Sequence, residues 1–178
     1  MKKKQDDRRV RLTRELLRRA FMTLLAEKPI EEISIKELCD LAQVNRSTFY
    51  AHYTDLRDLL RQIEDEMFEE FSQALDNLYQ PGRDGVEPVV VTTGVFQCLK
   101  DNSDLCVVTL GPHGDKNFAL RLLQCGREYC FANYAFYFKG ATRQQVEYCY
   151  AFISSGCIGL LNRWLEDGMQ MEPAELAR

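Results

Sequence analysis

The 178-residue sequence is poor in histidine and lacks closely spaced pairs of cysteines. It has only two histidines, His52 and His113, and its seven cysteines form no Cys-x-x-Cys pair. Structural zinc needs closely spaced cysteine and histidine ligands, so we predict no metal site and no cofactor. An odd number of cysteines without a secretion signal is typical of free cytosolic thiols, which serve either as small buried residues or as redox sensors.

Long apolar stretches are also missing. No run reaches the roughly 18 apolar residues of a membrane-spanning helix, and no apolar segment follows the basic start, as it would in a signal peptide. We therefore expect a cytoplasmic protein with no membrane partner. The sequence has no glycine-rich phosphate loop, no HExxH and no GxSxG, and an enzyme would have to rely on its cysteines. We predict no catalytic residues.

Glycine and proline are scarce before residue 80, and the apolar pattern there has a helical period. Apolar residues recur at spacings of three and four, which indicates helices over residues 9–26, 35–43, 46–52 and 56–79, and further helices near 86–100, 115–138 and 142–167. Ser34, Asn45 and Asp55 are predicted N-caps, and Ser34 with Glu37 has the capping-box spacing. Leu41 is predicted to pack inward. The fold class is therefore all-α.

Charge is distributed unevenly along the chain. The formal net charge is −4, but residues 1–60 carry 13 Lys+Arg against 10 Asp+Glu, whereas residues 61–178 carry 10 against 17. A basic head on an acidic body predicts contact with a polyanion at one end only. We expect Arg46 and the first-helix arginines, Arg14 and Arg18 among them, to supply much of the charge that meets phosphate.

The most specific pattern is SIKELCDLAQVNRSTFYAHY, residues 34–53. Two short helices joined by a turn of about four residues are typical of a helix-turn-helix, whose second helix enters a major groove of DNA. That helix has to begin with small polar residues so that its N-terminus can approach the phosphates closely. Phe49 and Tyr53 are predicted to hold it on the core.

Residues 9–60 resemble the DNA-binding domain of the TetR (tetracycline repressor) family. The matching segments are Thr13-Arg14, IKELC at 35–39, AQV at 42–44 and above all RSTFYAHY at 46–53, followed by Asp55 and Leu59. Gln43 stands where glycine is common in the family. Leu56 stands where lysine is common, so its phosphate contact is either missing or made by Arg57.

The resemblance implies a homodimer that places the third helix of each subunit in a major groove of a double-stranded DNA operator. The residues expected to contact DNA are Lys36, Asn45, Arg46, Ser47, Thr48, Tyr50, His52 and Arg57.

The second half of the chain is rich in aromatic residues and cysteine. Much of this must be helix core, but adjacent Tyr- and Cys-rich helices could also line an apolar cavity for a small apolar or aromatic effector. The predicted lining residues are Phe96, Cys125, Tyr129, Tyr148 and Phe152. The apolar, small-residue segment 152–165 is predicted to form the dimer through Ser155, Gly156, Gly159, Leu160 and Trp164.

These expectations divide the chain into a helix-turn-helix domain at 1–54 and an antiparallel helical bundle for effector binding and dimerisation at 55–178. The predicted function is a homodimeric, sequence-specific repressor that an effector releases from a pseudo-palindromic operator. The alternative is a DNA-binding activator whose C-terminal domain docks a protein co-regulator.

Overall fold

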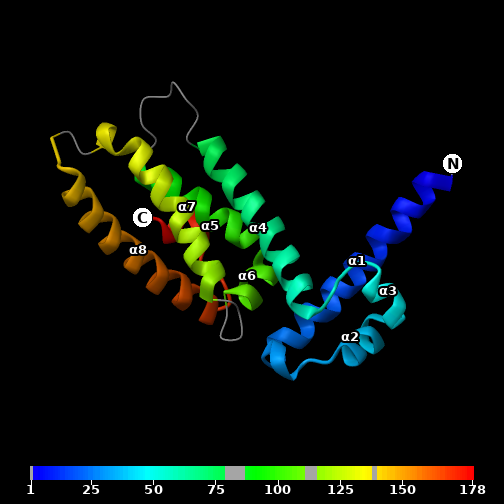
Figure 1. The fold of residues 1–178 in the computed structure, drawn as a ribbon. Coiled ribbons are helices and arrows are strands. Elements are labelled where there is room, and N and C mark those ends of the chain that lie inside the picture. The colour runs from blue at the N-terminus through cyan, green and yellow to red at the C-terminus, as the bar shows by residue number, and fades with distance from the viewer. Residues whose placement is uncertain (1, 79–86, 111–115, 138–139) are drawn as a thin grey trace. The chain divides into compact units, whose positions relative to one another are not determined.

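The computed structural model describes residues 2–78, 87–110, 116–137 and 140–178 (Figure 1). Every regular element within these ranges is a helix, which confirms the all-α prediction. The described residues fall into two compact units. The first lies within Met1–Glu66 and Val108–Gly114, and the second within Met67–Val107 and Asp115–Arg178.

The first unit is the head that contains the helix-turn-helix. Its elements are α1 (Lys2–Glu27), the 3-10 helix η1 (Ile30–Glu32), α2 (Ile35–Ala42), α3 (Arg46–Tyr50) and the first part of α4 (Leu56–Leu78). Helix α1 packs on α2, and α2 packs on α3. The fully buried apolar side chains of this core are Leu17, Phe21, Leu25, Leu38, Phe49 and Leu59. The backbone of α1 is helical from Lys2, seven residues earlier than the apolar period indicates.

Two predicted N-caps of the head are confirmed. The Ser34 hydroxyl accepts a hydrogen bond from the Glu37 amide at 3.1 Å, and the Asp55 carboxylate accepts one from the Asp58 amide at 2.8 Å. The carboxylate of Glu37 binds Lys28 Nζ at 2.7 Å, and this ammonium group lowers the pKa of Glu37. Asn45 occupies the N-cap position of α3 but makes no side-chain cap bond.

The inward packing predicted for Leu41 is wrong. Its side chain is 50% exposed, whereas Leu38 and Ala42 on the same helix are buried. Helix α2 has only eight residues and one buried stripe. A residue three positions after Leu38 therefore lies at the edge of that stripe rather than within it.

The turn between α2 and α3 has a left-handed backbone conformation at Gln43. This residue is the C-cap of α2, with φ 54° and ψ 41°. A side chain with a β-carbon is strained in that conformation, and glycine is the usual residue there. The left-handed conformation therefore explains why glycine is common at this position in the family. Gln43 adopts the same conformation with some backbone strain.

Replacing Gln43 with glycine is expected to stabilise the protein by about 0.5–1 kcal/mol. The substitution relieves a strain of about 1–2 kcal/mol, and the greater freedom of glycine in the unfolded chain offsets part of that gain. Urea unfolding measures the difference. Gln43→Ala is the matched control, because alanine keeps the strain and leaves stability nearly unchanged; equal stabilisation by both variants would contradict the explanation.

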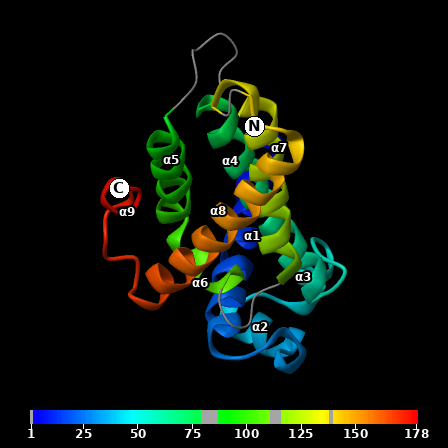
Figure 2. The same ribbon diagram turned by 90° about the vertical axis from the view of Figure 1, so that its left-hand side faces the viewer.

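The second unit contains the rest of α4 with α5 (Pro88–Asp101), most of α6 (Ser103–Thr109), α7 (Lys116–Tyr137), α8 (Arg143–Glu166) and α9 (Pro173–Leu176). Helices α7 and α8 pack on each other, and the short α9 packs on α5 (Figure 2). Thr142 and Gln145 form a complete capping box at the start of α8. No helix in the described ranges is long and apolar enough to cross a membrane.

Candidate nucleic-acid interface

Helix α3, the second helix of the helix-turn-helix, is held to the head by two aromatic side chains. Phe49 is fully buried and Tyr53 is 4% exposed, which confirms their assignment to the core. Their ring centroids lie 5.6 Å apart. Because Phe49 fixes one side of a five-residue helix, the opposite side of α3 is left facing outward.

Most of the residues predicted to contact DNA lie on the outer surface of α2, α3 and the turn between them. Those that are exposed are Lys36, Asn45, Arg46, Ser47 and Tyr50, whereas Thr48 and His52 are half-buried. Neither Lys36 nor Arg46 forms an ion pair with any residue that the structure describes. Both charges therefore remain available to a polyanion.

Arg57, the expected substitute for a missing lysine, has a partner in its own unit. Its guanidinium lies 2.7 Å from the carboxylate of Glu31 in η1. Both side chains are largely exposed, and exposed ion pairs contribute little to stability. The carboxylate nevertheless neutralises Arg57 locally, so the head loses part of the charge expected at the start of α4.

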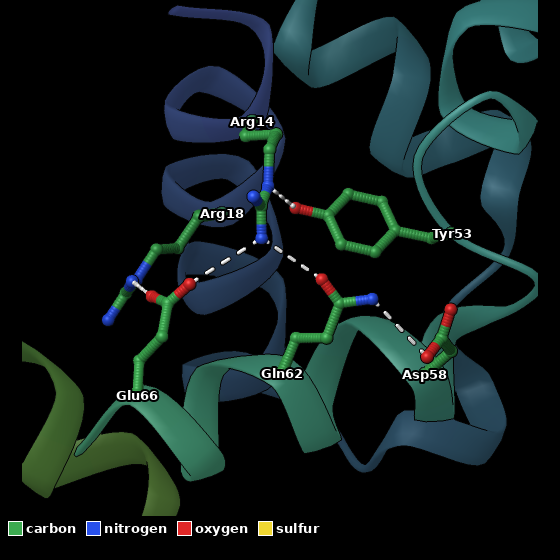
Figure 3. A network of polar contacts seen from close by, with 6 residues as sticks. All are labelled: Arg14, Arg18, Tyr53, Asp58, Gln62 and Glu66. Carbon is green, nitrogen blue, oxygen red and sulfur yellow. Dashed lines mark hydrogen bonds and ion pairs between the residues drawn. The ribbon is translucent and has the colours of Figure 1, made fainter. Parts of the chain in front are cut away.

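Two of the α1 arginines from which we expect DNA-facing charge, Arg14 and Arg18, have partners within the head, whereas Arg9 and Arg11 are exposed. Arg14 Nη2 lies 3.0 Å from Gln62 Oε1 and 3.5 Å from Glu66 Oε1 on α4, and Arg18 also binds Glu66 (Figure 3). Arg14 Nε donates to the Tyr53 hydroxyl at 3.4 Å. These two arginines thus join α1 to α4 within the head, an arrangement that a periodicity argument has no means of detecting.

The predicted effector-binding residues of the second unit do not gather in one place. Phe96 is buried against Trp164, while Cys125 lies beside Ser72 and Tyr129 donates a hydrogen bond to Asp76, both on α4. That hydrogen bond raises the pKa of Tyr129 to about 12.

Tyr148 and Phe152 are 70% and 82% exposed on α8, so their assignment to an internal cavity is wrong. An open surface depression of about 410 Å³ beside α7 is lined by other residues, Leu120, Arg121 and Tyr150 among them.

The predicted dimer residues are divided between two faces of α8. Ser155, Gly156 and Gly159 are exposed and Leu160 is half-buried. Trp164 is 3% exposed, donates its indole N–H to the Met171 carbonyl at 2.9 Å and belongs to the core of its own unit. Its assignment to the dimer face is therefore wrong, since the side chain has almost no surface left to bury against a partner.

Burial affects the acidity of four of the six cysteines that the structure describes. It raises the pKa of Cys39, Cys98, Cys106 and Cys157. The thiolate is the reactive form of cysteine, so burial disfavours the reactive form of these four thiols. Within the described ranges there is also no cluster of His, Cys, Asp and Glu that could hold a metal ion.

The fold and the exposed α3 define a helix-turn-helix transcriptional regulator. A TetR family model described as a transcriptional regulator C-terminal region matches residues 90–178, half of the chain. The protein belongs to the TetR family of DNA-binding transcriptional regulators. This is a family of regulators rather than of enzymes.

Similarity to a curated relative is concentrated in one short stretch. The chain is 44% identical over 61 residues to YxbF of Bacillus subtilis (strain 168), an uncharacterized HTH-type transcriptional regulator. The stretch covers 34% of this chain and 16% of the length of that relative. The chain therefore matches only a small part of the length of that relative.

Two solved structures share the fold over nearly the whole chain. The TetR transcriptional regulator from Streptococcus agalactiae 2603V has a TM-score of 0.64 and 25% identity, over 96% of this chain and 92% of that one. FadR from Bacillus subtilis, solved in complex with stearoyl-CoA, has a TM-score of 0.66 over 92% of each chain. At 12% identity, FadR shows likeness of fold alone.

Proposed function

We propose that the protein is a homodimeric repressor that binds a pseudo-palindromic operator and is released from it by a small-molecule effector. The observation that carries the proposal is the exposed surface of α2 and α3, where Lys36 and Arg46 have no ion-pair partner among the described residues. A short helix anchored by Phe49 is suited to enter a major groove, and its first residues are those placed to reach base edges and phosphates.

The exposed face of α8 supports dimerisation. Tyr148, Phe152, Gly156 and Gly159 follow one another at helical spacing and are all exposed. Glycine inside a helix costs about 1 kcal/mol relative to alanine, yet a β-carbon at Gly156 or Gly159 would meet nothing within 4 Å. Close approach by a second copy of α8 would explain both glycines. An isologous contact of this kind presents two heads to two half-sites.

The effector is the part of the proposal that rests most on the family. FadR, a neighbour of the same fold, is solved with stearoyl-CoA, so apolar acyl and aromatic compounds are the first class to test. Release then requires that the effector bind the conformation with low operator affinity more tightly than the other. Helix α4 begins in the first unit and ends in the second, so it is a direct covalent link between them, as is the short α6.

An effector is expected to raise the melting temperature of the protein and to release it from its operator at the same concentration. At one hundred times its dissociation constant, a ligand of the native state adds about 2.7 kcal/mol of stability, or roughly 5–10 °C for a chain of this size. Screening by thermal shift and then titrating hits into a protein–operator complex measures both effects. Compounds that stabilise the protein without releasing DNA would contradict effector-controlled repression.

A DNA-binding activator that docks a protein co-regulator is the second candidate. Tyr148 and Phe152 favour it, because two large exposed aromatic side chains on one helix also suit a protein partner. A reporter driven by the gene's own upstream DNA separates the two functions. Deleting the regulator raises expression if it represses and lowers expression if it activates.

A further inference from the structure

We propose that Arg14 and Tyr53 position the recognition helix α3 against α4, and that they raise operator affinity without contacting DNA. The proposal rests on the operator binding proposed above and adds two positioning residues to it. It follows from a continuous set of contacts within the first unit, from α4 through α1 to the base of α3 (Figure 3).

On α4, hydrogen bonds to neighbouring residues hold the side chains that contact Arg14. Gln62 Nε2 donates to Asp58 Oδ1 at 3.3 Å, and Asp58 Oδ2 in turn accepts from the Thr54 amide at 2.9 Å. Asp58, Gln62 and Glu66 are spaced by four residues and so share one face of α4. Gln62 and Glu66 present their oxygens to Arg14 at 3.0 and 3.5 Å.

The α3 end depends on the hydroxyl of Tyr53. This oxygen accepts from Arg14 Nε at 3.4 Å, while the ring of the same residue is buried against Phe49. Phe49 lies three residues after Arg46 and is the buried anchor of α3. A displacement of Arg14 would therefore shift Tyr53 and the Phe49 ring packed against it. Because Phe49 anchors α3, the position of Arg46 would change as well.

The guanidinium of Arg14 is directed into these contacts, and two of its nitrogens are occupied by three partners on α4 and at Tyr53. An arginine in a DNA-binding head can either contact a phosphate or position other residues, and salt dependence distinguishes the two roles. A phosphate contact contributes about 0.9 to the slope of log affinity against log salt concentration, whereas a positioning contact changes affinity and leaves that slope alone.

The test is operator binding by Arg14→Gln, Tyr53→Phe and the double variant, each measured from 50 to 300 mM salt. We expect Arg14→Gln to weaken operator binding about tenfold and Tyr53→Phe about threefold, with the salt slope of wild type in both. Because the two residues act through one hydrogen bond, the double variant should bind about as well as Arg14→Gln alone.

Two variants serve as references for the salt slope. Arg46→Ala removes a residue expected to contact DNA and should lower the slope. Arg163→Gln replaces an exposed arginine of the second unit, paired with Asp167 at 3.0 Å, and should behave as wild type. If Arg14→Gln does not fold, Tyr53→Phe decides, because phenylalanine keeps the ring on Phe49.

Three results would overturn the positioning role: unchanged affinity in Tyr53→Phe, a slope in Arg14→Gln reduced by about one per protomer, or additive losses in the double variant. A wild-type protein that does not prefer its operator to random DNA would instead refute operator binding itself. The two failures are therefore distinguishable.

Discussion

Phe152→Glu is expected to convert the protein from dimer to monomer and to lower operator affinity by about 10²–10⁴-fold. Phe152 is 82% exposed in the single chain, and burying such a ring against a partner contributes about 1.5–3 kcal/mol per subunit. In a twofold contact the substitution places two carboxylates near each other in apolar surroundings. A monomer then holds one half-site at a time and loses the avidity of two linked heads.

Sedimentation velocity measures the oligomeric state, and a titration with operator DNA measures the affinity. Leu120→Glu is the matched control, because Leu120 is also an exposed apolar residue, 61% accessible, but lies on α7. It should remain dimeric. If the Phe152→Glu protein stays dimeric and binds its operator like wild type, this face of α8 is not the dimer interface. If it stays dimeric and binds DNA but no longer activates a reporter, the result favours docking of a protein co-regulator on this face.

Arg46→Ala is expected to weaken specific binding by about 1–3 kcal/mol per half-site, roughly 5–150-fold, and to relax sequence preference where Arg46 meets a base. Arg46 is the first residue of α3, is exposed and has no ion-pair partner among the described residues, so its loss should leave the fold intact. Fluorescence anisotropy on labelled operator, with single base-pair changes in each half-site, measures both effects.

Arg57→Ala is the control for the loss of one positive charge. Arg57 already pairs with Glu31, so its removal should change operator affinity about twofold or less. Equal losses for Arg46→Ala and Arg57→Ala would show that general electrostatics, rather than α3, governs binding.

The head could be predicted closely from its sequence because local chemistry determines most of it. The periodicity of apolar residues located α2 and α4 to within about two residues, and the helix-turn-helix pattern located the five-residue α3. Ser34 and Asp55 marked two helix starts through bonds that span three residues. The short elements η1 and α6 were not predicted. Each has seven residues or fewer, which is too short for a helical period to be recognised.

Contacts between distant segments explain the remaining errors. Arg14 and Gln62 are 48 residues apart, and no local pattern indicates that an arginine on the polar face of α1 belongs to α4. In α8, the helical period shows which residues share a face but not whether that face meets the core or solvent. Trp164 was therefore placed on the dimer face, and Phe152 in a cavity, when their exposures are the reverse.

If this chain recognises DNA sequence through α3, it must distinguish between two DNAs of the same composition. The affinity of wild-type protein for the gene's own upstream DNA is measured against a shuffled sequence of the same length and composition, at 150 mM salt. A specific regulator should prefer the upstream DNA by at least about 10³-fold. Equal affinities for the two DNAs would contradict the account.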